Sequence, residues 1–364
     1  MELVKSSYDP KEVTILLKDI TGLVESMGTK EREKLIQSGV HYSEMLPLEY
    51  KPTEDYMKLY ESELKRSGYK TAKAIANLGD KLFEKKGTNL VLVSLARAGT
   101  PIGILLRRYL KLRYDIEVSH YSISIIRGKG IDINALDYIL DNERNKVLGL
   151  QFIDGWIGKG AIQRELKDSI ALYNSTRFVD IDPNLAAVAD PSMTIPDRYC
   201  GTREDFIIPS SCLNATVSGL FSRTFRRPDI IGDKDFDGAV YYGELKDEDK
   251  SIEFLDEITD WLEDIVEEKK EEIEENQFTG LDEVKQIAKD YEIEDINKIK
   301  PGVGETTRLL LRRYPDRVLI NMRDINDPDL DCVIQLCKEK NVPIERYPLE
   351  RYKVVGIIKD VSDL

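Results

Sequence analysis

The stretch LVLVSLARAGTPIG, residues 90–103, decides the fold class of this 364-residue chain. Its apolar run is typical of a buried parallel strand, and it ends at Leu95 in a turn that carries Arg97 and Gly99. A strand that leads through a glycine-containing turn into a helix is where α/β proteins hold phosphate groups. The stretch therefore predicts a parallel sheet with a phosphate site at its carboxyl edge.

Three further apolar runs, at 116–126, 147–153 and 185–191, are separated by segments of helical period. This alternation predicts a doubly wound parallel α/β sheet. Before it, residues 1–87 are expected to form a helical lead-in, and after it DFDGAVYYGEL at 235–245 is a further strand candidate. An acidic run between Glu263 and Glu275 predicts a domain boundary near residues 276–280. The expected domains are 1–275, with a core at about 88–245 and a hood from 1–87 and 192–260, and a small α/β domain at 276–364.

Composition limits the classes of function. A net charge of −14 argues against nonspecific binding of the whole chain to nucleic acid or membranes. The first residues lack a basic region followed by an apolar core, and no run could span a bilayer, so we expect a cytoplasmic protein without a membrane partner. Four cysteines without CxxC spacing and two histidines predict neither a disulfide framework nor a metal held by protein ligands alone.

Two more segments have the composition of phosphate-binding loops. After the strand that ends at Ile153, Asp154 suits ribose hydroxyls, and three glycines would let backbone amides approach a phosphate beside Lys159. These glycines are Gly155, Gly158 and Gly160. Arg127 and Lys129 stand in a short glycine-hinged segment that could close over a polyanion. Each segment alone could also be a structural turn, a local ion pair or a solvated loop, but together they favour a phosphorylated ligand.

These residues carry a family resemblance. The segments HYSEMLP, SLARAGTPIG, HYSISIIRGKGID, FIDGWIGKGAIQREL and GTREDFIIPSSCLNATVSGLFSRT together resemble a bacterial family of phosphoribosyltransferase-like proteins from tellurite-resistance and stress gene clusters. That family also carries the name cysteine protease StiP and ends in a pelota-type RNA-binding domain. The resemblance implies a phosphoribosyltransferase-type sheet that binds phosphoribosyl diphosphate, with Mg²⁺ chelated by the diphosphate, and transfers the phosphoribosyl group to an unknown small-molecule acceptor.

The resemblance also implies residue roles. The catalytic residues would be Asp154, Arg97, Arg127 and Lys129. The substrate would contact Ser94, Ala98, Gly99, Gly155, Gly158, Lys159, Gly160, Arg203, Asn214, Ser218 and Arg223. The chain has Ile153 where phosphoribosyltransferases have a second acid, and its loop has no hydroxyl. This departure favours an alternative, a noncatalytic nucleotide or phosphoribosyl sensor with an RNA-binding tail.

A second alternative is a cysteine protease. Its nucleophile would be Cys200 or Cys212 and its base His120 or His41. The structural alternative is that Cys212 is a small buried apolar residue and Cys200 a loop residue.

The last domain has a local basic edge. Between Lys298 and Arg317 there are six basic residues and two acids, which indicates RNA contact or an ordinary helix with a solvated arginine face. The segment GVGETTR at 302–308 resembles pelota and kink-turn RNA binders, although Gly304 replaces the usual Asn. The expected RNA-binding residues are Gly302, Glu305, Thr307, Arg308 and Arg312.

Overall fold

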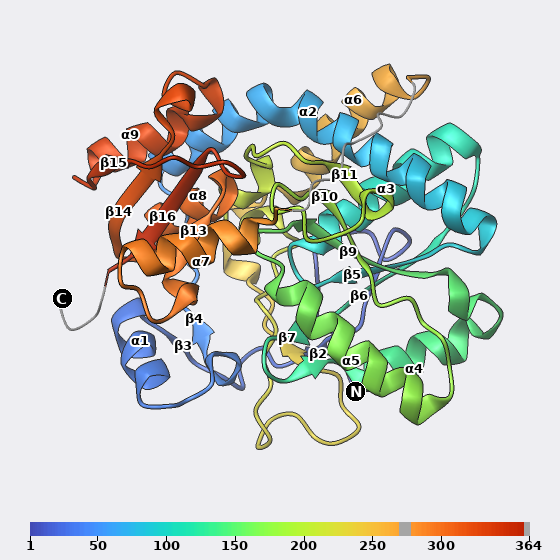
Figure 1. Cartoon of the computed structure of the whole chain (residues 1–364). Helices are drawn as coiled ribbons and strands as arrows, with labels where there is room; N and C mark the ends of the chain where they lie inside the picture. Colours follow the sequence, from blue (N-terminus) through green and yellow to red (C-terminus); the bar gives the residue numbers. More distant parts are fainter. Residues whose placement is uncertain (269–277, 360–364) are drawn as a thin grey trace.

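The computed structural model describes residues 1–268 and 278–359, and its centre is a six-stranded sheet (Figure 1). The strand order is β1-β6-β5-β9-β10-β11, and every neighbouring pair is parallel. The strands are β1 (Thr14–Ile15), β5 (Val91–Leu95), β6 (Ser119–Ile123), β9 (Leu150–Trp156), β10 (Leu185–Ala189) and β11 (Cys200–Thr202). The prediction of a parallel α/β sheet is confirmed, because the four apolar runs form its four central strands.

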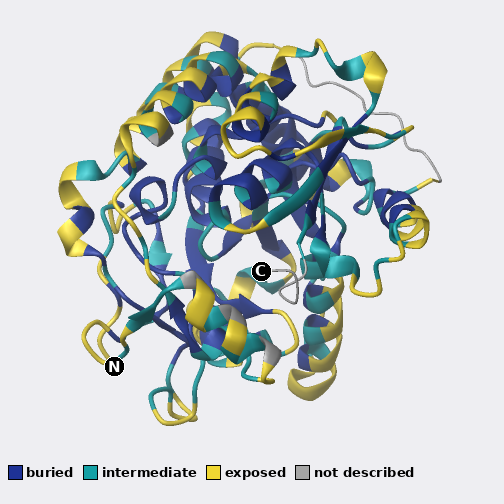
Figure 2. Cartoon of the chain, turned by 90° about the vertical axis from the view of Figure 1, so that its left-hand side faces the viewer, coloured by how far each residue is buried: buried dark blue, intermediate teal, exposed yellow. Residues whose placement is uncertain are grey.

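Helices cover both faces of this sheet. From β5 the chain crosses to β6 through α3 (Gly99–Tyr114), and then returns past β5 to β9 through α4 (Ile133–Asn142). Because parallel crossovers are right-handed, this reversal puts α4 and the next helix, α5 (Ala161–Arg177), on the face opposite α3. Helices α2 (Glu54–Lys86) and α6 (Ser251–Ile265) pack with α3. Figure 2 shows the central strands buried between these layers.

The expectation of a helical lead-in is correct only for part of residues 1–87. Helix α2 is long, but the first 28 residues contain no helix, and β1 instead pairs with the edge of β6. The buried run Leu16–Leu17 explains this, since a short apolar segment beside a sheet edge gains more by strand pairing. The remaining short elements are β2 (Lys18–Asp19), β3 (Ser26–Met27), α1 (Thr29–Gln37), β4 (Leu46–Pro47), β7 (Ile125–Ile126), β8 (Gly130–Ile131) and β12 (Gly238–Ala239).

The strand candidate at 235–245 contributes only β12, which pairs with β2 rather than with the central sheet. No helix within residues 1–268 and 278–359 combines the length and the apolar character needed to cross a membrane.

The C-terminal part, called here the C-terminal module (residues 278–359), has a four-stranded sheet in the order β13-β16-β14-β15. Its elements are α7 (Gly280–Asp290), β13 (Ile299–Pro301), α8 (Val303–Arg312), β14 (Pro315–Ile320), α9 (Asp331–Glu339), β15 (Ile344–Arg346) and β16 (Val354–Ile358). The boundary expected between residues 275 and 276 lies outside the described residues.

The C-terminal module shares a hydrophobic core with the rest of the chain. Leu309 and Leu310 of α8 and Val333 of α9 belong to the same buried cluster as the strands of the central sheet. A smaller cluster between α7 and the second sheet is separate from it. The module is therefore docked through apolar contacts, and α8 lies over the carboxyl edge of the central sheet.

Candidate functional site

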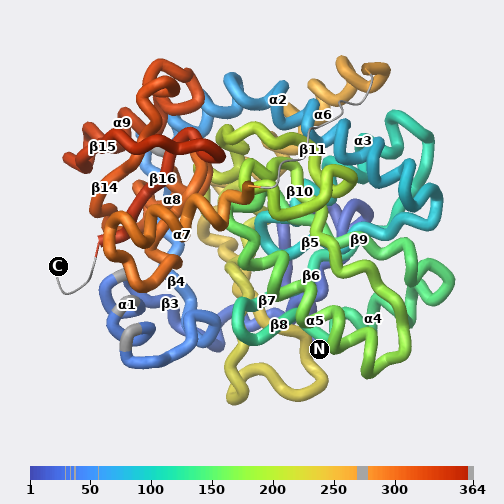
Figure 3. Tube along the Cα trace, viewed as in Figure 1, coloured from blue at the N-terminus to red at the C-terminus, as the bar shows by residue number. Residues whose placement is uncertain are grey.

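A cavity of about 840 Å³ lies where the C-terminal module meets the central sheet. Its walls include the turn after β5, the end of β9, residues 47–53 and the segment 300–314. Figure 3 shows how the chain brings these distant segments together, from blue near the N-terminus to orange in α8. Strand order reverses between β5 and β9, so the cavity lies at the switch point where α/β sheets bind ligands.

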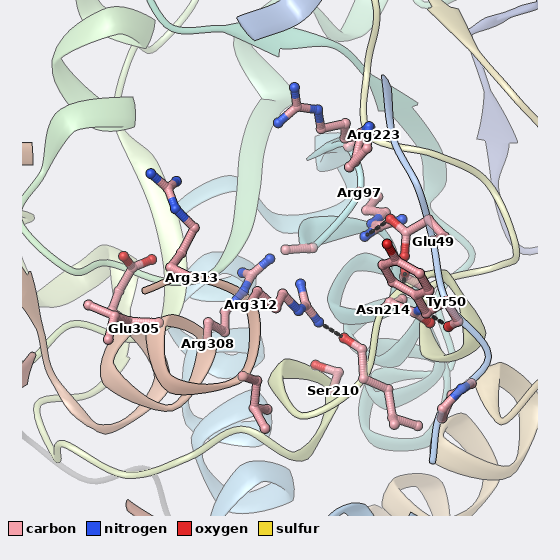
Figure 4. A pocket seen from close by; sticks show the side chains of 18 of the residues that line it. Glu49, Tyr50, Arg97, Ser210, Asn214, Arg223, Glu305, Arg308, Arg312 and Arg313 are labelled. Atoms are coloured by element: carbon pink, nitrogen blue, oxygen red, sulfur yellow. Dashed lines mark hydrogen bonds and ion pairs between the residues drawn. The ribbon is translucent and has the colours of Figure 1, made fainter. Parts of the chain in front are cut away.

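The lining is strongly basic in a protein of net charge −14. Eight cationic side chains face the cavity, against three carboxylates. The cations are Arg32, Lys51, Arg97, Arg223, Lys300, Arg308, Arg312 and Arg313, and the acids are Glu49, Asp154 and Glu305. Figure 4 shows that α8 and the segments around Arg97 and Arg223 contribute these groups from different sides. Such a concentration of like charge creates a positive potential that favours an anionic ligand.

Arg97, predicted from the opening stretch, lines the cavity and is fixed by two contacts. Its Nη2 donates to Glu49 Oε1 at 2.9 Å and its Nη1 to the carbonyl of Phe221 at 3.0 Å. Burial opposes ionisation of Glu49, but the charges of Arg97 and Arg312 and the hydrogen bond from Arg97 hold its pKa below the usual value. Sequence reasoning missed Glu49, although it stands only two positions after the HYSEMLP segment.

Arg308 is the cation in the cavity that is least engaged by the protein. Its guanidinium lies 5.4 Å from the ring centroid of Trp156, a cation–π contact. Within the described part of the chain it forms no hydrogen bond and no ion pair, and burial lowers its pKa. A half-buried guanidinium keeps its five donors for a ligand in this position.

Asp154, also predicted, lines the cavity at the end of β9. Its Oδ1 accepts a hydrogen bond from the Gly155 amide at 2.8 Å, and burial raises its pKa to about 6. The charge of Arg308 opposes this increase and that of Glu305 adds to it.

Because the folded pKa of Asp154 exceeds its ordinary value of 3.8, folding becomes less favourable as the pH rises from 3.8 through about 6. We expect Asp154→Asn to increase the free energy of unfolding at pH 7.5 by about 1–2 kcal/mol, and to have little effect below pH 4. Urea denaturation at several pH values measures this difference. Asp168→Asn, at an exposed position on α5, is the control. Equal stability of Asp154→Asn and the unmodified protein at pH 7.5 would contradict the expectation.

The C-terminal module covers the glycine-rich loop. Contrary to the expectation, this loop therefore does not line the cavity. A Cβ at Gly158 would lie 3.2 Å from Glu305 Cγ, and the Tyr352 hydroxyl donates to the Gly158 carbonyl at 2.5 Å. Lys159 Nζ donates to two carbonyls of the module, and burial lowers its pKa to about 8. Gly160 has a positive φ of 72° and packs on Thr194. The loop is therefore an interface for the module, and Gly155 is also outside the lining.

The basic segment after β7 turns away from the cavity. Arg127 Nη1 donates to Asn297 Oδ1 at 2.8 Å, and Lys129 pairs with Glu44 at 2.7 Å. Neither side chain lines the cavity, so the expectation that they cover the same ligand as Arg97 does not hold in this conformation.

The other expected substrate contacts divide into two groups. Ala98, Asn214, Ser218 and Arg223 line the cavity. Ser94, Gly99 and Arg203 do not, because each has a structural role. Ser94 Oγ lies 2.8 Å from His120 Nε2, a Cβ at Gly99 would meet the carbonyl of Ile153 at 2.4 Å, and Arg203 pairs with buried Asp190 at 2.7 Å.

The amino end of α8, where RNA contact was expected, is closed. Asp205 Oδ1 accepts a hydrogen bond from the Val303 amide at 2.8 Å, and its Oδ2 accepts one from the Lys353 amide at 2.9 Å. Thr307 is buried with its hydroxyl on the Val303 carbonyl, and Gly302 packs against Asp205. Glu305, Arg308 and Arg312 instead line the cavity. An RNA contact by these five residues stays a prediction.

The cysteines and histidines do not form a pair. Cys200 and Cys212 are buried, and burial raises the pKa of Cys200 to about 12 and that of Cys212 well above its ordinary value. His120 is buried, its Nδ1 is 3.0 Å from the Glu12 carbonyl, and burial lowers its pKa to about 3. His41 contacts Ser43 and the backbone of Arg127. Both imidazoles are thus engaged by groups other than a thiol.

Comparison with known proteins gives two family matches. Residues 6–259 match the family described as "Tellurite-like stress resistance cysteine protease StiP", and residues 278–360 match the PELOTA RNA binding domain. A relative named "Cysteine protease StiP", from Acinetobacter baylyi (strain ATCC 33305 / BD413 / ADP1), is 33% identical over 362 residues. This match covers 93% of this chain and 89% of the relative. No solved structure gives a significant match.

These names overturn the main functional expectation from the sequence. The prediction that the protein transfers a phosphoribosyl group to an acceptor is wrong, because the family and the relative are both named as a cysteine protease. That activity was one of the alternatives drawn from the sequence. The recognition of the family itself is confirmed over most of the chain. The chain belongs to the StiP family of tellurite-like stress resistance proteins, followed by a PELOTA RNA binding domain.

Proposed function

We propose that this protein binds a phosphate-bearing polyanion in the cavity between the central sheet and the C-terminal module. The observation that carries the proposal is the excess of eight cations over three carboxylates around one cavity of a strongly acidic chain. Arginine guanidinium groups match phosphate oxygens in geometry and hold them through paired hydrogen bonds. The position at a switch point of the sheet supports the same class of ligand.

Two finer features belong to this proposal. The sheet order and the site after β5 support a phosphoribosyltransferase-type sheet that is used here for binding. A Mg²⁺ ion chelated by the phosphates would enter with the ligand. The carboxylates of Asp154 and Glu305, which line the cavity, could accept hydrogen bonds from the water molecules bound to this ion.

Calorimetric titration with inorganic pyrophosphate, with and without Mg²⁺, tests the proposal. We expect saturable binding, and we expect Arg308→Met to weaken it about ten- to a hundredfold, because charge-assisted hydrogen bonds to the ligand are lost. Arg144→Met is the matched control, since Arg144 is exposed, does not line the cavity and pairs with Asp141 three positions away. No binding at millimolar pyrophosphate, or equal binding by Arg308→Met, would refute the proposal.

Cysteine proteolysis is the second candidate function, favoured by the names of the family and of the relative. We propose Cys212 as the nucleophile to test first, because Ser210, Leu213 and Asn214 beside it line the cavity. Its buried thiol must become exposed and ionised to react. Hydrolysis of a dye-labelled denatured protein should then be lost in Cys212→Ala and retained in Cys337→Ala. Full activity in a Cys200→Ala, Cys212→Ala double variant would exclude this candidate.

A further inference from the structure

We infer that the cavity hydrolyses a phosphoanhydride, and that Asp154 is the general base that activates the attacking water. This inference rests on the proposed function of the cavity and goes beyond binding. It assigns a reaction and a catalytic residue to the site.

The carboxylate of Asp154 supplies the first argument, because it differs from the other two carboxylates in the cavity. Glu49 pairs with Arg97 at 2.9 Å. Glu305 lies 3.9 Å from Lys300. In the part of the chain that the structure describes, Asp154 forms no ion pair, and its Oδ2 accepts no hydrogen bond. One carboxylate oxygen is therefore left to accept a proton from water at the cavity wall.

The cost of this carboxylate supplies the second argument. Burial raises the pKa of Asp154 to about 6, so the ionised group opposes folding at neutral pH. Its negative charge at the wall of a phosphate site also repels the ligand. The charged groups that act on it are both on α8, where Arg308 lowers its pKa and Glu305 raises it. A carboxylate that weakens both folding and ligand binding, with a pKa near neutral pH, is typical of a residue retained for proton transfer.

The division of the cations supplies the third argument. Four of the eight that line the cavity belong to residues 1–268 and four to the C-terminal module. Figure 4 shows Arg97 and Arg223 across the cavity from Arg308 and Arg312 of α8. A phosphoanhydride carries negative charge on both of the phosphates that its bridging oxygen joins, so it makes use of cations on both sides. A single phosphate would need the cations of one side only.

The reaction is a displacement at phosphorus. Asp154 Oδ2 takes a proton from water while the water oxygen forms a bond to one phosphorus atom, and the bond from that phosphorus to the bridging oxygen breaks. The electron pair of the broken bond leaves on the second phosphate. Asp154 then returns its proton to the solvent. Because the leaving phosphate is a stable anion, the arginines around it need only stabilise its charge.

Release of orthophosphate from pyrophosphate by the full-length protein, with and without Mg²⁺, tests the inference. We expect turnover, and we expect Asp154→Asn to lower kcat by a factor of about 10²–10⁴, the usual effect of a lost general base. In the unmodified protein kcat should rise with pH through a pKa at or above about 6, because bound phosphate adds negative charge beside Asp154. This rise should be absent in the variant. Asp168→Asn, at an exposed position on α5, is the control.

Calorimetry with methylenediphosphonate, whose P–C–P link cannot be hydrolysed, measures binding separately from turnover. Asp154→Asn should bind this compound at least as tightly as the unmodified protein does, because a charge of the same sign as the ligand has been removed. A residue with only a structural role in the cavity would lower binding and turnover together.

The outcomes distinguish the inference from the proposed function. Turnover that is lost in Asp154→Asn, with binding of methylenediphosphonate retained, supports both. Binding of methylenediphosphonate without release of orthophosphate from pyrophosphate overturns the inference and leaves the proposed function standing. Failure of both ligands to bind overturns both, and turnover that is unchanged in Asp154→Asn overturns the inference.

Discussion

Arg97→Met should lower the free energy of unfolding by about 3–5 kcal/mol and abolish pyrophosphate binding. The Arg97 and Glu49 side chains are only 13% and 7% exposed, and they pair at 2.9 Å. Removal of the guanidinium leaves the Glu49 carboxylate buried without its cation, which costs far more than the loss of a surface ion pair. Urea denaturation measures the stability, and calorimetry measures the binding.

A Glu49→Met, Arg97→Met double variant separates the two effects. It should recover much of the lost stability, because no unpaired charge remains buried, but it should not bind pyrophosphate. Because the pKa of Glu49 is lowered in the folded protein, the contribution of the pair to stability depends on pH. Its contribution to stability is present above the ordinary carboxyl pKa of 4.5 and is lost as the pH falls through the lower folded value. Equal stability of Arg97→Met and the unmodified protein at pH 7 would show that the pair is not needed for folding.

Asp205→Ala should loosen the docking of the C-terminal module and lower the free energy of unfolding by about 2–4 kcal/mol. The carboxylate accepts hydrogen bonds from the Val303 and Lys353 amides, and the variant leaves both donors without that partner. It also removes an anion from the amino end of α8, where the helix dipole favours negative charge. Hydrogen exchange at these two amides should therefore become faster than in the unmodified protein.

The matched control is Asp282→Ala. Asp282 forms the capping box of α7 with Thr279, so its loss affects one helix end inside the module and should cost about 1 kcal/mol. If Asp205→Ala were no more destabilising than Asp282→Ala, the contact of Asp205 with α8 would be a minor part of the docking.

The fold and part of the site were predictable because their signals are local. Each central strand lies in a short segment rich in apolar residues, and Arg97 and Asp154 stand near the carboxyl ends of two of these segments. Glu49 was missed because its partner lies 48 positions away and only the folded chain brings them together. The role of Lys159 was misjudged for a similar reason, since nothing in a glycine-rich loop indicates that another module will cover it.

The surroundings of the arginines of α8 could not be predicted from the sequence either. Their pattern indicated a basic helix, but its side chains face a cavity of the central sheet instead of an open surface. Burial of the Cys212 thiol was anticipated only as one of two alternatives, and the expectation that Cys200 is a loop residue was wrong, because Cys200 is buried at the start of β11. Spacing along the chain does not report depth in the fold.

The hydrophobic core that runs from the central sheet into α8 and α9 has a consequence for how this protein can change during evolution. Modules that are joined only by a linker can be exchanged, duplicated or lost one at a time. Here the removal of residues 278–359 would expose the apolar partners of Leu309, Leu310 and Val333 and would open one wall of the cavity. The two parts must therefore be inherited together, and a substitution in either part is selected in the context of the other.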